Sequence, residues 1–80
     1  MTKELLNDLQ ENAGLTEADA IAVYDYVSHQ AQISGANLQL KFRLGYNKAG
    51  RILEQLEKHG IVSNYDGFIP RSVLINKKSL

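Results

Sequence analysis

The residues from Phe42 to Val62 constrain the fold more than any other stretch of this 80-residue chain. Small and apolar residues recur there at i, i+3, i+4, i+7 and i+11: Ala49, Ile52, Leu53, Leu56 and Gly60. This spacing predicts an amphipathic helix with one face in a core. The opposite face carries hydrogen-bonding side chains: Asn47, Lys48, Arg51, Glu54, Gln55 and Lys58. We expect the helix to end near Gly60 in the left-handed conformation and a strand to begin at Ile61-Val62.

Three shorter helices are predicted before this one. The first runs from Lys3 to about Asn12, and the second begins after Thr16, which has the position of an N-cap, and ends near His29. Ser34 can cap the third, from about Gly35 to Phe42, and Ile33 before it is a candidate for a very short strand. The expected buried stripe of the second helix is Ala20, Val23, Tyr24, Val27 and Ala31. Asp25 and Ser28 are expected to face solvent.

Two strands are predicted after Gly60, from Ile61 to Tyr65 and from Phe68 to Ile75. Asp66-Gly67 between them is a strong signal for a type I′ hairpin turn, because both residues tolerate positive φ. Pro70 has no N–H to donate and is therefore expected at an edge or a bulge. Tyr65 and Phe68 flank the turn and are expected to form a cross-strand aromatic pair.

The order of these elements predicts a mostly α-helical fold with a small β-hairpin, a winged helix-turn-helix preceded by an additional N-terminal helix. Residues 1–14 would form the additional helix, residues 15–76 the winged-helix domain, and residues 77–80 a frayed tail. There is no cysteine, and no apolar run is long enough to cross a membrane. We therefore expect a cytoplasmic protein without a membrane contact.

The net charge is zero, but the charges are segregated along the chain. Residues 1–33 hold one lysine and six carboxylates, a net charge of −5, and residues 34–80 hold eight cations and three carboxylates, a net charge of +5. A basic second half that contains the central helix favours a nucleic-acid partner over an ordinary mixed surface. The first helix is acidic, and its carboxylates Glu4, Asp8 and Glu11 are expected to be solvated, opposite its leucines.

Residues 33–75 resemble the gamma domain at the C-terminus of the FtsK family of bacterial DNA translocases. The resemblance is carried by Phe42-Arg43-Leu44-Gly45-Tyr46-Asn47-Lys48-Ala49-Gly50-Arg51-Ile52, Glu54-Gln55-Leu56-Glu57, Gly60-Ile61-Val62 and Pro70-Arg71-Ser72-Val73-Leu74. It implies a winged helix that reads a short, asymmetric, G-rich motif in double-stranded DNA and that also touches a site-specific tyrosine recombinase. The DNA-contacting residues that it implies are Asn47, Lys48, Arg51 and Glu54 on the helix and Arg71 on the wing; we add Arg43 as a phosphate contact.

The chain departs from the family pattern in three ways. Lys48 stands where arginine is common, which keeps the charge but loses the planar fork of donors. Gly50 stands where alanine is usual. The phosphate-binding loop Gly-x-x-x-x-Gly-Lys-Ser/Thr of the translocase motor is absent from the sequence. We expect a free-standing small protein, and a fragment of a translocase stays open as an alternative.

The side chains with catalytic chemistry do not form a recognisable active site. His29 and His59 lie at predicted helix ends, where a histidine interacts with the helix dipole, and no third metal ligand lies near either in the sequence. We expect no catalytic residue, no metal and no cofactor, and thus no enzyme. The open alternative for Arg51 is an i, i+3 ion pair with Glu54.

A second function class also stays open at this point. The acidic first helix lies outside the winged helix and suits a module that binds another protein, for example a phage-encoded inhibitor of a host nucleoprotein complex. A homodimer with that helix as its seam is a third alternative.

Overall fold

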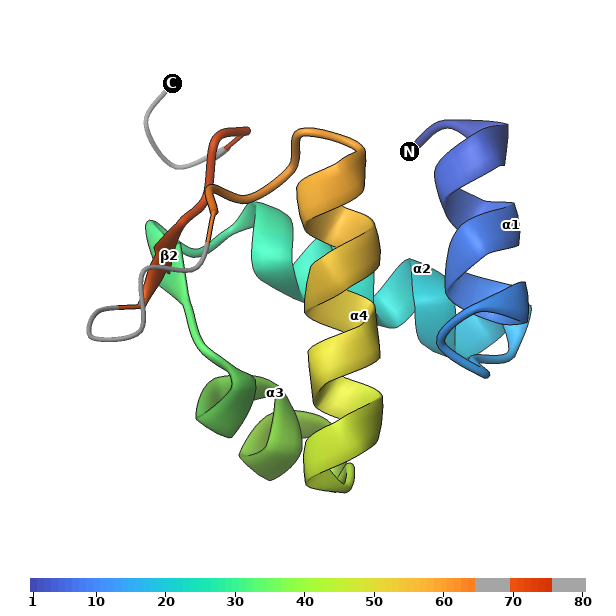
Figure 1. The fold of residues 1–80 in the computed structure, drawn as a ribbon, viewed down its shortest axis with the longest axis horizontal. Coiled ribbons are helices and arrows are strands. Elements are labelled where there is room, and N and C mark those ends of the chain that lie inside the picture. Colours follow the sequence, from blue (N-terminus) through green and yellow to red (C-terminus); the bar gives the residue numbers. More distant parts are fainter. Residues whose placement is uncertain (65–69, 76–80) are drawn as a thin grey trace.

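The computed structural model describes residues 1–64 and 70–75. In chain order these form α1 (Lys3–Glu11), α2 (Glu17–Ser28), β1 (Gln32–Ile33), α3 (Gly35–Phe42), α4 (Tyr46–Lys58) and β2 (Arg71–Ser72). The predicted class, a mostly helical winged helix with a small antiparallel sheet and one extra helix, is confirmed. Figure 1 shows α1 and β2 on opposite sides of α4, with α3 beside the N-terminal half of α4.

The helices begin where short polar side chains accept hydrogen bonds from the first turn. Thr16 Oγ1 accepts from the N–H of Asp19 at 3.1 Å, and Ser34 Oγ accepts from the N–H of Asn37 at 3.2 Å. The predicted caps of the second and third helices are therefore confirmed, and these hydrogen bonds satisfy N–H groups that the helices leave open. Thr2 caps α1 in the same way.

One hydrophobic core holds all four helices together. The predicted inner face of α4 is buried at Ala49, Ile52, Leu53 and Leu56. Gly60 is exposed rather than part of this stripe, and its φ of 74° gives the left-handed helix end that the sequence predicted. Leu5 and Leu9 of α1 are also buried, so the additional helix is an integral part of the core.

The inner face of α2 differs from its prediction at two positions. Ser28 was expected to face solvent, but it is fully buried and its hydroxyl donates to the carbonyl of Asp25 at 2.8 Å. Ala31 was expected in the core but is exposed. The helix α2 ends at Ser28, so the helical period does not extend to Ala31 and does not put it on the buried face. In α3, Leu38 is buried in the core and Phe42 packs against it, while Leu40 is 82% exposed.

The sheet is smaller than predicted and pairs differently. The predicted strand from Ile61 reduces, within the described residues, to a single bridge between Val62 and Val73. The strand β2 instead pairs antiparallel with β1, with Ile33 opposite Arg71. The sequence did not predict this partner, because β1 and β2 lie on either side of two helices in the chain. The predicted Asp66-Gly67 turn, its flanking aromatic residues and the predicted frayed tail fall outside the described residues.

Candidate nucleic-acid interface

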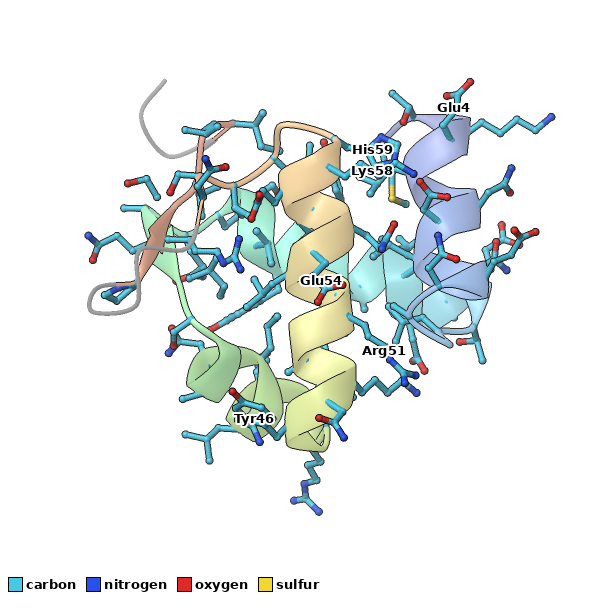
Figure 2. All side chains as sticks on the ribbon, in the orientation of Figure 1. Glu4, Tyr46, Arg51, Glu54, Lys58 and His59 are labelled. Carbon is cyan, nitrogen blue, oxygen red and sulfur yellow. The ribbon has the colours of Figure 1, made fainter. Side chains whose placement is uncertain are left out.

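The exposed face of α4 is one continuous line of polar side chains. Asn47, Arg51, Glu54 and Lys58 follow one another at i, i+4, i+7 and i+11, and all four are exposed. Residues at this spacing lie above one another on a helix surface. Figure 2 shows Arg51 and Glu54 on the middle of α4, with Lys58 at its C-terminal end.

A groove of about 920 Å³ runs beside this line, between α3, α4 and the strands. Asn47, Arg51 and Glu54 contribute to its wall on the α4 side, and Ser34 and Gln39 contribute from the α3 side. Four of the six predicted site residues thus share one groove, since Arg71 also lines it. Lys48 and Arg43 lie outside the groove lining.

The sequence left an ion pair with Glu54 open as an alternative role for Arg51. Among residues 1–64 and 70–75, none of the ion pairs involves Arg51. The guanidinium is exposed on the outer face of α4. Its five donors are therefore presented to solvent in a planar fork, the geometry that matches two acceptors side by side.

Arg71 is held differently from the other predicted site residues. Its Nη1 donates to Glu57 Oε1 of α4 and, at 3.2 Å, to the carbonyl of Ser63. The side chain is only 11% exposed. The guanidinium therefore links β2 to the C-terminal end of α4, which fixes the position of β2 relative to the helix.

One predicted site residue ends α3, and another lies in the first turn of α4. Arg43 is exposed and ends α3 with a φ of 54°, a left-handed conformation that is uncommon for a residue other than glycine. Lys48 is half-buried in the first turn of α4. The N-cap of α4 is Gly45, which has no side chain to accept from the first N–H groups.

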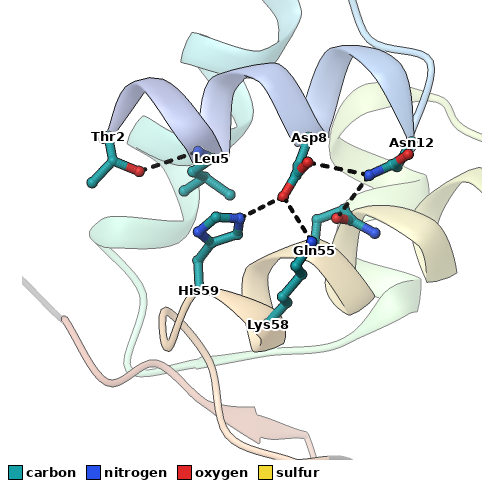
Figure 3. Close-up of polar contacts among 7 residues, drawn as sticks. All are labelled: Thr2, Leu5, Asp8, Asn12, Gln55, Lys58 and His59. Carbon is teal, nitrogen blue, oxygen red and sulfur yellow. Dashed lines mark hydrogen bonds and ion pairs between the residues drawn. The ribbon is translucent and has the colours of Figure 1, made fainter.

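Asp8 forms a polar cluster between α1 and α4 that the sequence did not predict (Figure 3). Its Oδ2 lies 2.7 Å from Nε2 of His59 and 3.2 Å from Nζ of Lys58. The hydrogen bond with His59 and then the one with Lys58 hold the pKa of the Asp8 carboxyl below its ordinary value of 3.8. Beside them, the Nδ2 of Asn12 donates to Oε1 of Gln55 at 3.3 Å.

The expectation that Glu4, Asp8 and Glu11 are all solvated is therefore wrong for Asp8, whose side chain is 21% exposed. Asp8 follows Leu5 by three positions, and this spacing places both on the side of α1 that packs against the domain. That spacing is the signal from which the contact could have been found. His59 does lie at the helix end as predicted, but its contact with Asp8 was not predicted.

Within the described residues, no group of three histidine, cysteine, aspartate or glutamate side chains is arranged to hold a metal ion. No helix in the described part of the chain is both long and apolar enough to cross a membrane.

Gly50 faces outward on α4, and an added Cβ would meet no atom within 4 Å. Gly50→Ala is therefore expected to stabilise the fold by up to about 1 kcal/mol, since glycine is the poorer helix former. Urea unfolding measures this change. Gly60→Ala is the matched control and is expected to destabilise, because alanine is strained at a φ of 74°. A loss of stability in Gly50→Ala would contradict the open surroundings of this position.

The three-helix core, the short sheet and the exposed polar face of its last helix define a winged-helix domain. The model of the Ftsk gamma domain family matches residues 17–76, which include this face and the groove beside it. The chain belongs to this family, as its resemblance in sequence implied. The match begins at the first residue of α2, so α1 precedes it.

Curated relatives of the chain include DNA translocases. The chain is 33% identical over 82 residues to the DNA translocase FtsK of Clostridium acetobutylicum, a match that covers 98% of this chain and 11% of the relative. It is 53% identical over 55 residues to the DNA translocase FtsK of Chlorobaculum tepidum, a match that covers 68% of this chain and 7% of the relative. It is 34% identical over 74 residues to the DNA translocase SftA of Bacillus subtilis, a match that covers 90% of this chain and 8% of the relative. The chain thus spans 11% or less of these relatives. No solved structure matches it.

Proposed function

We propose that this protein binds double-stranded DNA by placing α4 in the major groove, and that it reads a short duplex motif there. The observation that carries the proposal is the exposed line Asn47, Arg51 and Glu54, in which Arg51 has no ion-pair partner among the described residues. A helix of this length is about 20 Å long at ~1.5 Å per residue, and its diameter of about 10–12 Å with side chains suits the major groove, which is about 12 Å wide. Membership of a domain family of DNA translocases supports the same reading.

Each side chain of the line has a natural base partner. The guanidinium of Arg51 suits O6 and N7 of guanine, the amide of Asn47 suits the N6 and N7 positions of adenine, and the carboxylate of Glu54 can accept from the amine of cytosine. These contacts would supply sequence preference, with a guanine at the centre of the motif.

Phosphate contacts are assigned to the turn before α4. Arg43 and Lys48 flank the start of the helix, and the N-cap Gly45 leaves the first N–H groups without a side-chain acceptor. A phosphate group that reaches this turn would meet two cations and those N–H groups together. Arg71 has a supporting role, because its guanidinium already donates to Glu57 and so holds β2 beside α4.

The alternative of a protein-binding module relied on the acidic first half of the chain and on a first helix outside the winged helix. The structure turns the middle carboxylate, Asp8, toward α4 and leaves Glu4 and Glu11 exposed. Two exposed carboxylates suit a solvated surface as well as a protein partner, whereas the exposed line on α4 suits base edges, so we favour the DNA-binding proposal.

The dependence of DNA binding on salt tests the proposal. If three to five phosphates are contacted, log K should fall with log salt at a slope of roughly −3 to −4.5, because each contact releases condensed counterions. Fluorescence anisotropy with a labelled duplex of about two helical turns (roughly 20 base pairs) measures the slope. A binding constant that does not change with salt, or the absence of binding at low salt, would overturn the proposal.

A further inference from the structure

The C-terminal end of the DNA-facing line is occupied by a contact within the protein. Lys58 is the last residue of the line and of α4, and its ammonium lies 3.2 Å from the carboxylate of Asp8 on α1 (Figures 2 and 3). Lys58 itself is 63% exposed, so its side chain reaches Asp8 across the surface and is not enclosed there.

We infer that Asp8 is an internal competitor for DNA phosphate: its carboxylate holds the ammonium of Lys58 that would otherwise bind the duplex backbone, and so sets the affinity of the interface. The inference rests on the proposed DNA-binding function. A carboxylate oxygen and a phosphate oxygen are the same kind of acceptor for an ammonium group, and a lysine carries a single compact charge. The contact with Asp8 offsets the charge of Lys58 and uses one of its three donors, so it weakens the attraction of Lys58 for phosphate.

The cluster is built so that Lys58 can leave it. Asp8 keeps a second partner, because His59 lies at 2.7 Å and is more enclosed than Lys58. Release of Lys58 consequently does not leave the carboxylate without a hydrogen bond, which would be expensive in a half-buried position. The helix α1 also keeps its place, since Leu5 and Leu9 remain buried in the core.

The same contact explains why an acidic helix can lie beside a DNA-facing one. The carboxylate of Asp8 is the member of the acidic set that faces α4, and Lys58 and His59 are the two basic groups that face it. Glu11, in contrast, is exposed and enters none of the ion pairs found in the described part of the chain. Glu11 therefore offers a matched control of identical charge on the same helix.

The experiment compares Asp8→Asn with Glu11→Gln on a random-sequence duplex. We expect Asp8→Asn to tighten binding about three- to eightfold at about 0.1 M salt and to make the salt slope more negative by about 0.9, the effect of one added phosphate contact. Glu11→Gln removes the same charge and should change affinity much less. Asp8→Ala serves as a second variant, since alanine favours the helix, and both variants are first checked by circular dichroism and urea unfolding.

Lys58→Gln completes the test when it is made both in the wild type and in Asp8→Asn. It should have a small effect in the wild type, where Asp8 holds the ammonium, and should abolish the gain in Asp8→Asn. Equal affinities of Asp8→Asn and Glu11→Gln, or an equal loss from Lys58→Gln in both backgrounds, would overturn the inference while the salt-dependent binding of the wild type still supported the proposed function. A wild type that bound no duplex would overturn both.

Discussion

Truncation of Leu9 to alanine is expected to lower the free energy of unfolding by about 2–5 kcal/mol, the range for deletion of a buried leucine with a cavity left behind. Leu9 is completely buried, although it belongs to the helix that precedes the winged helix. Because a domain of this size has only about 5–15 kcal/mol of stability, this loss is a large fraction of the total. Urea and thermal unfolding measure the loss, at about 4–8 °C per kcal/mol.

Leu40→Ala is the matched control for this prediction. Leu40 is 82% exposed on α3, and its truncation should change stability by less than about 0.5 kcal/mol. Similar losses in the two variants would contradict the packing described for α1. A large loss confined to Leu9→Ala would show that α1 folds as one unit with the winged helix.

The second large effect is expected on DNA recognition. Arg51→Ala should lose about 1–3 kcal/mol of binding free energy on the preferred duplex and should flatten the differences among duplexes, because a bidentate contact to guanine carries that much discrimination. Its stability should hardly change, since the side chain is exposed and pairs with no described carboxylate. Selection of duplexes from a random library, followed by anisotropy titrations, measures both quantities.

Two further variants distinguish a base contact from a phosphate contact. Arg51→Lys keeps the charge but loses the planar fork, so it should preserve the salt slope and still lose sequence preference. Arg43→Gln should weaken binding to all duplexes alike, as expected at a phosphate contact. If Arg51→Ala and Arg43→Gln behaved in the same way, Arg51 would be a phosphate contact and the assigned base readout would be wrong.

The parts of the fold that the sequence predicted well are those set by local rules. The buried stripe of α4 follows from its 3.6-residue period, and the starts of α2 and α3 follow from Thr16 and Ser34. Local rules also determine which residues form the exposed line of α4, because a helix that buries Ile52 and Leu56 must expose Arg51 and its neighbours in the line.

The parts that it missed depend on contacts between distant segments. Asp8 meets Lys58 and His59 only because α1 packs beside the end of α4. The pairing of Gln32–Ile33 with Arg71–Ser72 has the same origin, and so has the contact of Arg71 with Glu57. Periodicity describes one element at a time and carries no information about which element lies next to which, so it also left the partner of Arg71 unknown.

The pairing of β1 with β2 has a consequence for the order of folding. The two strands lie on either side of α3 and α4 in the chain, so their ladder closes a long loop, and loop closure is entropically unfavourable until other contacts hold its ends together. The turn between α3 and α4 needs no such closure, and local contacts of this kind form early. The helical core should therefore be built first and the sheet that supports the wing last. When the protein unfolds, the pairing of β1 with β2 should open before the helical core does. Hydrogen exchange at the amide of Val73 would then report a smaller opening free energy than exchange at the amide of Leu56.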